Sequence, residues 1–237
     1  MNLCISKTFR SLVVLTSMAL QAACSASAPD YAAIVASPDR PANERSLDAA
    51  RKPQEVMAFY GVKSGDKVAD VSAGRGYYTA ILSEIVGAQG TVYTVNANSR
   101  DEINQRWKAP KFANVRVADG SFDKLALLPG GSLDFVIIHL NYHDLAPEVR
   151  GAMNQRVLAA LKKGGVYAVV DHSAKEGSGN EAAKTLHRID KLLVIKEVTS
   201  AGFTLAKEGT MLRNPEDSRA TNQRENSDRF VLKFEKP

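Results

Sequence analysis

The chain has 237 residues, of which 44% are hydrophobic, and its formal net charge is +5. This composition excludes a chain that is disordered throughout, and the length predicts one domain with a substantial core. There are no long lysine and arginine runs with interleaved aromatic residues, so we expect no nucleic-acid partner.

Residues 1–26 are predicted to be a signal peptide, which places the mature protein in a bacterial periplasm. Lys7 and Arg10 precede an apolar run from Leu12 to Leu20, and small residues follow. The run is shorter than the ~20 apolar residues of a transmembrane helix, so an uncleaved anchor is the less favoured alternative. We expect cleavage between Ala23 and Ala28.

Both cysteines, Cys4 and Cys24, lie in this leader. A chain cleaved after Cys24 can form no disulfide and offers no thiolate ligand. The stretch "LQAAC" also resembles a bacterial lipoprotein signal, in which Cys24 would carry a lipid anchor. Gln21 stands where such signals have an aliphatic residue, so ordinary cleavage is favoured.

Residues 27–45 contain three prolines and several small residues, and they predict an extended linker arm before a domain over 46–237. A helical pattern begins at Ser46, is divided or restarted at Pro53, and ends at Gly61.

Short apolar runs then alternate with amphipathic helices. The predicted strands are 66–73, 90–96, 113–119, 132–140 and 166–172, and the predicted helices are 77–87, 99–108, 147–165 and 181–202, the last with a break. Two final strands, 203–212 and 228–236, have no helix between them, and the polar residues 212–217 are a candidate lid. The pattern predicts a doubly wound α/β fold: a mainly parallel sheet of about seven strands with an antiparallel edge pair at the C-terminus.

The stretch "DVSAGRG", residues 70–76, joins the first strand to a helix through a glycine turn. In open α/β sheets ligands bind beyond the carboxyl ends of the strands, where Gly74 and Gly76 lie. A dinucleotide fingerprint needs glycine or alanine where Thr79 stands, which disfavours a nicotinamide cofactor. A purely structural turn is equally compatible with the stretch alone.

The turn resembles the acidic-x-Gly-x-Gly-x-Gly loop of class I S-adenosylmethionine-dependent methyltransferases, which are Rossmann-like. It matches at Asp70, Gly74 and Gly76 but has Ser72 at the first glycine. The resemblance covers residues 46–237. More narrowly, "RKPQEVMAFYGV", "NYHD", "VVDH", "LHRID" and "DRFVLKF" resemble a group of exported bacterial proteins described as predicted methyltransferases.

The resemblance implies an S-adenosylmethionine-dependent methyltransferase, with an acceptor that the sequence does not identify. Asn96 stands where the family usually has an acid that binds the ribose, and Asp119 where a contact to the adenine is common. The implied cofactor-binding residues are Asp70, Ser72, Ala73, Gly74, Gly76, Asn96, Asp119 and His139.

Three of the four histidines, His139, His143 and His172, fall at the carboxyl ends of predicted strands, and His187 lies in the helix that follows. Histidine and carboxylate groups at the ligand edge are a candidate site. We predict His143, Asp144, Tyr142 and Asn141 as the catalytic set, in which His143 or Asp144 orients or deprotonates the acceptor. Each histidine taken alone is also compatible with a structural role.

Two other interpretations use the same residues. Histidine and aspartate are good zinc or iron ligands, but neither H-x-x-E-H nor H-E-x-x-H occurs, so we predict no metal. A non-catalytic ligand-binding protein on this fold is favoured by Ser72, Asn96 and the export signal. Arg45, Arg51 and Lys52 form either an exposed charged face or a site for an acidic substrate.

Overall fold

The computed structural model describes residue 1 and residues 28–98, 100–126 and 128–237. The predicted signal peptide, apart from Met1, and Cys24 lie outside the described residues. Within the described ranges, no helix combines the length and the apolar character needed to cross a bilayer.

The strands form one sheet with the order β3-β2-β1-β4-β5-β7-β6. They are β1 (Lys67–Val71), β2 (Thr91–Val95), β3 (Val115–Val117), β4 (Leu133–His139), β5 (Leu161–His172), β6 (Thr204–Gly209) and β7 (Arg229–Glu235). The strands from β3 to β5 are parallel, whereas β7 pairs antiparallel with both β5 and β6. The predicted mainly parallel sheet with an antiparallel C-terminal pair is confirmed.

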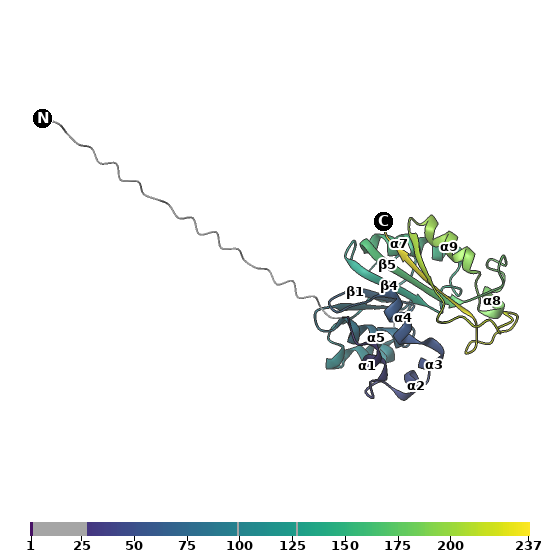
Figure 1. Cartoon of the computed structure of the whole chain (residues 1–237), viewed down its shortest axis with the longest axis horizontal. Helices are drawn as coiled ribbons and strands as arrows, with labels where there is room; N and C mark the ends of the chain where they lie inside the picture. Colours follow the sequence, from purple (N-terminus) through teal and green to yellow (C-terminus); the bar gives the residue numbers. More distant parts are fainter. Residues whose placement is uncertain (2–27, 99, 127) are drawn as a thin grey trace.

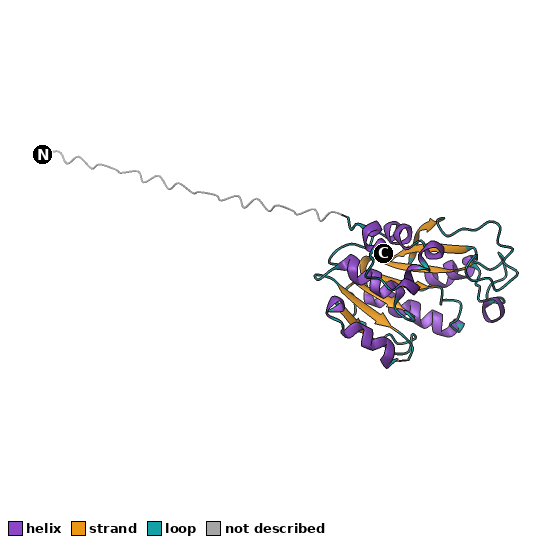
Figure 2. Ribbon diagram, turned by 90° about the horizontal axis from the view of Figure 1, so that it is seen from below, coloured by secondary structure: helices purple, strands orange, loops and turns teal. Residues whose placement is uncertain are grey.

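Helices cover both faces of this sheet (Figure 1, Figure 2). The helices are α1 (Tyr31–Ala36), α2 (Ala42–Arg45), α3 (Asp48–Arg51), α4 (Pro53–Tyr60), α5 (Tyr77–Val86), α6 (Asp101–Asn104), α7 (Pro147–Ala160), α8 (Ala183–Leu186) and α9 (Lys191–Ser200), with 3₁₀ turns η1 (Gln105–Lys108) and η2 (Pro110–Phe112). Phe135 and Ile137 of β4 pack with α4 and α5, and Val136 and Ile138 pack with α7 and α9. The apolar run of β4 is continuous because both of its faces are buried.

The segment 27–45 is not the extended arm that its prolines predicted, since it contains α1 and α2. The side chain of Asp30 caps α1, and the hydroxyl of Tyr31 donates a hydrogen bond of 2.5 Å to the carbonyl of Val62. Pro41 directly precedes α2, a position where proline costs the helix no hydrogen bond. Pro41 therefore begins a helical turn, and Tyr31 and Ile34 pack against the core of the domain.

Two helix boundaries also differ from the prediction. Within the predicted helix 99–108, the described residues from 100 on form only the short α6 followed by the 3₁₀ turn η1. Residues 161–165, predicted as the end of a helix, begin β5 instead, because Leu161 already pairs with Leu133 of β4. The predicted breaks are confirmed: α3 and α4 are separated at Lys52, and α8 and α9 at residues 187–190.

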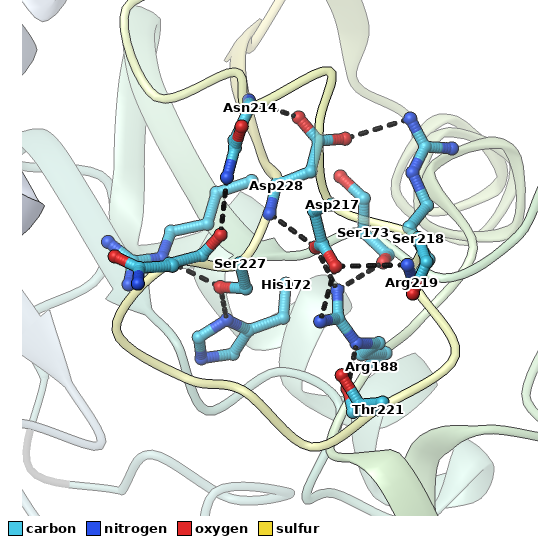
Figure 3. Close-up of polar contacts among 12 residues, drawn as sticks. His172, Ser173, Arg188, Asn214, Asp217, Ser218, Arg219, Thr221, Ser227 and Asp228 are labelled. Carbon is cyan, nitrogen blue, oxygen red and sulfur yellow. Dashed lines mark hydrogen bonds and ion pairs between the residues drawn. The ribbon is translucent and has the colours of Figure 1, made fainter.

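The connection between β6 and β7, residues 210–228, is tied to the domain by buried ion pairs (Figure 3). The side chain of Arg188 is 1% exposed and donates to Asp217 at 2.8 Å and to the carbonyl of Thr221 at 3.0 Å. Burial alone would raise the pKa of Asp217, but its hydrogen bonds from backbone N–H groups and from Arg188 outweigh burial and lower that pKa.

Asp228 forms the second anchor of this connection. Its side chain is fully buried and pairs with Arg213 at 2.7 Å and with Arg219 at 2.9 Å. The polar residues 212–217, a candidate lid from sequence, are therefore fixed to the domain at several points.

Replacing Asp217 by alanine leaves the buried guanidinium of Arg188 without its counter-charge. We expect Asp217→Ala to lower the free energy of unfolding by about 3–5 kcal/mol. The exposed neighbour Glu216 is the matched control, and Glu216→Ala should stay within about 0.5 kcal/mol of the parent. Urea unfolding measures both, and similar small losses in the two variants would contradict an anchoring role for the pair.

Candidate active site at the carboxyl edge of the sheet

The glycine turn after β1 has a left-handed backbone at three positions. The φ angles are 59° at Ser72, 59° at Gly74 and 83° at Gly76. A Cβ on Gly76 would come within 2.2 Å of the ring of Trp107, so glycine is required there. Ser72 holds the same conformation with a side chain, and its carbonyl accepts a hydrogen bond of 3.0 Å from the amide of Asn141.

A cavity of about 420 Å³ lies over this turn and the ends of β1, β4 and β5. Its volume is in the range of pockets that hold a small-molecule ligand. It is lined by Asp70, Ser72, Ala73, Gly74, His139 and Asn141 from the predicted site, and also by Asn43, Glu44, Leu47, Ala50, Arg51, Arg75, Tyr77, Tyr78, Leu140, His172, Arg224, Glu225 and Arg229. Of the predicted residues, Gly76, Asn96, Asp119, Tyr142, His143 and Asp144 are not in its lining.

Asp70 is 3% exposed at the end of β1. Burial raises the pKa of its carboxyl to about 6, although hydrogen bonds from Thr79 and the nearby charge of Arg51 oppose the shift. The hydroxyl of Thr79 donates to this carboxylate at 2.7 Å. Thr79, which argued against a dinucleotide in the sequence, therefore fixes the acidic group of the loop.

Two buried polar atoms at the cavity have no hydrogen-bond partner. They are the hydroxyl of Tyr78 and Nε2 of His139, whose rings are in contact with centroids 4.5 Å apart. Burial, and then the charges of Arg51 and Arg229, lower the pKa of His139 well below its usual value, so its ring is neutral. A polar ligand in the cavity would satisfy both atoms, which are otherwise costly to bury.

Asn96 and Asp119 stabilise the glycine turn through hydrogen bonds. The side-chain oxygen of Asn96 accepts from the N–H of Gly74 at 2.9 Å, and its amide donates to the carbonyl of Gly74 at 3.3 Å. Asp119 in turn accepts from the N–H of Asn96 at 2.8 Å. In this structure both residues hold the glycine turn in place.

His143 is held by Asp171, the buried residue next to the end of β5. Nδ1 of His143 lies 2.7 Å from Asp171, which also accepts from the backbone N–H groups of His143 and His172 at 2.8 Å. Burial opposes protonation of His143, but the bond and charge of Asp171 outweigh it and raise the pKa of His143. Because Asp171 accepts the hydrogen on Nδ1, Nε2 of the neutral ring presents a lone pair.

His172 is the histidine between His143 and the cavity. The rings of His143 and His172 have centroids 5.8 Å apart, and Nδ1 of His172 lies 2.5 Å from the hydroxyl of Ser227. Burial, followed by the charge of Arg229, lowers the pKa of His172 to about 3. The ring of His172, which lines the cavity, is therefore neutral.

Asp144 and His187 complete a group with His143. One oxygen of Asp144 lies 3.2 Å from Nε2 of His143 and 3.2 Å from Nδ1 of His187. A lone pair in this position can accept a proton or bind a cation. The structure thus places His143 and Asp144 together with His187, which is distant in the sequence.

Tyr142 is placed away from this group. It is fully buried, and its hydroxyl donates to Glu197 at 2.8 Å and accepts from the amide of Asn154 at 2.8 Å. Arg150, also fully buried, completes this cluster through a bond of 2.8 Å to Glu197. Tyr142 therefore connects α7 and α9, and of the predicted catalytic set only Asn141 lines the cavity.

The sequence analysis missed Tyr78, Arg224 and Arg229 in the lining. Tyr78 is the second residue of α5, which begins directly after the glycine turn, so the start of α5 was an available signal. Arg224 and Arg229 come from the far end of the chain, where no motif marked them. Arg229 is fixed by bonds of 2.5 Å to the carbonyls of Ala50 and Arg224.

Residues 68–165 match the family model described as Methyltransferase domain. A protein-L-isoaspartate O-methyltransferase of Ignicoccus hospitalis is 26% identical over 144 residues, covering 60% of this chain and 63% of that protein. One from Methanococcus aeolicus is 27% identical over 117 residues, covering 43% of this chain and 52% of that protein. The chain spans less than two thirds of the length of these curated relatives.

Solved structures show the same fold. An S-adenosylmethionine-dependent methyltransferase from Aquifex aeolicus is 20% identical with a TM-score of 0.61, covering 82% of this chain and 97% of that one. One from Mesorhizobium loti is 16% identical with a TM-score of 0.61, covering 80% of this chain and 100% of that one. The chain therefore has the Rossmann-like fold of class I methyltransferases. Residues 68–165 of this fold match a methyltransferase domain.

The raised pKa of Asp70 predicts a pH-dependent stability difference. The folded protein binds a proton at Asp70 more readily than the unfolded chain, so the ionised carboxylate costs stability as the pH rises through about 6. Asp70→Asn should therefore be more stable than the parent at about pH 7.5 by an amount on the order of 1–3 kcal/mol. This advantage should vanish near pH 4. Thermal unfolding at both pH values measures it, and an advantage that is equal at both would contradict the shift.

Proposed function

We propose that this chain is an exported methyltransferase that binds S-adenosylmethionine in the cavity over the glycine turn and methylates an acceptor at the end of β4 and β5. The observation that carries the proposal is the cavity itself, with the unpartnered Tyr78 hydroxyl and His139 Nε2 at its wall. The residues present fit the cofactor, which supplies an electrophilic methyl group.

In this proposal, the chain's own residues bind and orient the cofactor. The open space beside Gly74 lets the backbone approach a ligand closely, since a side chain there would meet no atom within 4 Å. Asp70 is ionised at neutral pH and attracts the positive charges of the cofactor. Arg51 lies over the ring of Tyr77 at 4.4 Å from its centroid and offers a guanidinium for the cofactor's carboxylate.

The acceptor end lies beyond His172, where Asn141, His143 and Asp144 follow β4. Their contribution is to hold the acceptor's reacting group in line with the methyl group, because positioning is the main demand of such a transfer. Protein L-isoaspartate, the acceptor named for the two curated relatives, is the first candidate to assay.

A non-catalytic ligand-binding protein is the second candidate function. The observation that favours it is the amide of Asn96, which is bonded to Gly74 where the resemblance implies an acid for the ribose. Such a protein would bind S-adenosylmethionine and its demethylated product without turnover on any acceptor. Assays of the two functions share the binding step and differ only in methyl transfer.

Gly74→Ala tests the cofactor site. Alanine would place a methyl group at the cavity wall, so we expect S-adenosylmethionine affinity to fall at least about 10-fold, which corresponds to about 1.4 kcal/mol. Gly131→Ala is the matched control, because Gly131 has a φ of 62°, close to the 59° of Gly74, and similarly open space. Isothermal calorimetry should show wild-type affinity for the control. No heat with the parent protein at millimolar cofactor would refute the site.

We also propose export, which rests on the N-terminal sequence alone. The mature chain is expected to begin between Ala23 and Ala28, in the periplasm or on a membrane through a lipid on Cys24. Intact-mass measurement of protein from the native cell envelope distinguishes these forms by the mass of the lipid. Soluble cytoplasmic protein that retains residues 1–22 would overturn the proposal.

A further inference from the structure

The group formed by His143, Asp144 and His187 has the arrangement of a metal site. Nε2 of His143, one carboxylate oxygen of Asp144 and Nδ1 of His187 all lie within 4.8 Å of one another. They come from the segment after β4 and from the end of α8, so the tertiary structure alone brings them together. Imidazole and carboxylate are the ligands that zinc and ferrous iron accept.

The strongest indication is the unpartnered nitrogen of His143. This residue is 4% exposed, and its Nε2 makes no hydrogen bond. Because Asp171 accepts the hydrogen on Nδ1, a neutral ring would direct the lone pair of Nε2 at an oxygen of Asp144 3.2 Å away. A cation between these two atoms, either a proton on Nε2 or a metal ion, offsets the repulsion between the lone pair and the carboxylate oxygen.

The distances favour a metal ion as that cation. Ligand atoms at about 2.0–2.1 Å from a tetrahedral zinc are about 3.3 Å apart. The oxygen of Asp144 is 3.2 Å from both histidine nitrogens, and without an ion it is hydrogen-bonded to Nδ1 of His187. A proton on Nε2 would form an ion pair with Asp144 at this distance, but Nε2 makes no hydrogen bond, and the metal site uses this unpartnered atom.

The surroundings are also those of a metal site. Asp171 bonded to the other nitrogen of His143 forms the carboxylate–histidine pair that orients metal ligands. The side chains of Asp144 and His187 are 48% and 30% exposed, so an ion could enter from solvent and keep an open position. Three protein ligands with an open position are typical of catalytic zinc sites.

We propose that His143, Asp144 and His187 bind a divalent transition metal ion, of which zinc is the representative. The sequence pointed away from a metal because it lacks the known helical spacings, but His187 is supplied by a distant segment. In the proposed enzyme the ion would bind the acceptor's nucleophilic atom beside His172 and lower its pKa, so His143 would act as a ligand and not as a base. That role rests on the proposed function, whereas metal binding itself does not.

The test is zinc titration of the untagged, chelator-treated full chain by calorimetry, without S-adenosylmethionine. We expect one zinc per chain. Asp144→Asn and His187→Ala should each weaken binding by about 100-fold or more, since altering even an outer partner costs about 10–100-fold. Glu148→Gln is the matched control, because Glu148 is an exposed carboxylate near Asp144, and it should bind like the parent.

Thermal unfolding without metal should be similar in all variants, because Asp144 and His187 are partly exposed. Cobalt titration adds a spectroscopic readout, in which loss of the visible absorption of bound cobalt follows loss of these ligands. Binding that is absent, or that is equal in the parent, Asp144→Asn and His187→Ala, would overturn the metal site. Because no cofactor is present, either result leaves the cofactor prediction untouched.

Discussion

The carboxylate of Asp171 is the interaction on which the candidate acceptor end depends. It is fully buried and accepts hydrogen bonds from two backbone N–H groups and one imidazole. A buried carboxylate is tolerated only with such donors, so each of them is needed where it stands. The bonds join the segment after β4 to the end of β5, and they fix the ring of His143 with one nitrogen turned away from Asp171.

Buried polar groups are paired in the β6–β7 connection but partly unpaired at the ligand edge of the sheet. Around Arg188 and Asp217 the charges are paired, and the connection is anchored. Along the ligand edge, Tyr78, His139 and His143 each keep a buried polar atom without a partner, and these are three of the six such atoms among the described residues. Incomplete satisfaction of this kind costs stability in the unliganded chain, and at the ligand edge it is compensated when a polar ligand binds.

The two departures from the family pattern in the glycine turn fit together physically. Ser72 adopts a left-handed conformation that favours glycine, and Asn141 binds its carbonyl. Asn96 binds both backbone groups of Gly74. Two asparagine side chains therefore hold a turn that carries one glycine fewer than the pattern. The rigidity of the turn comes from these amides, which serves either a catalytic or a purely binding protein.

The sequence by itself determined the order of elements, the mainly parallel sheet and the antiparallel C-terminal pair, because each follows from local apolar periodicity and from the absence of a helix between the last strands. It also located the glycine turn and the histidines at strand ends. Only the tertiary structure decided how these side chains are used. In the structure the side chain of Asn96 is hydrogen-bonded to Gly74, and Tyr142 is buried between α7 and α9. Arg229 and His187 lie at the ligand edge although they come from distant segments of the chain. Local patterns carry the period of a strand or helix, whereas side-chain partners depend on packing between residues far apart in the chain.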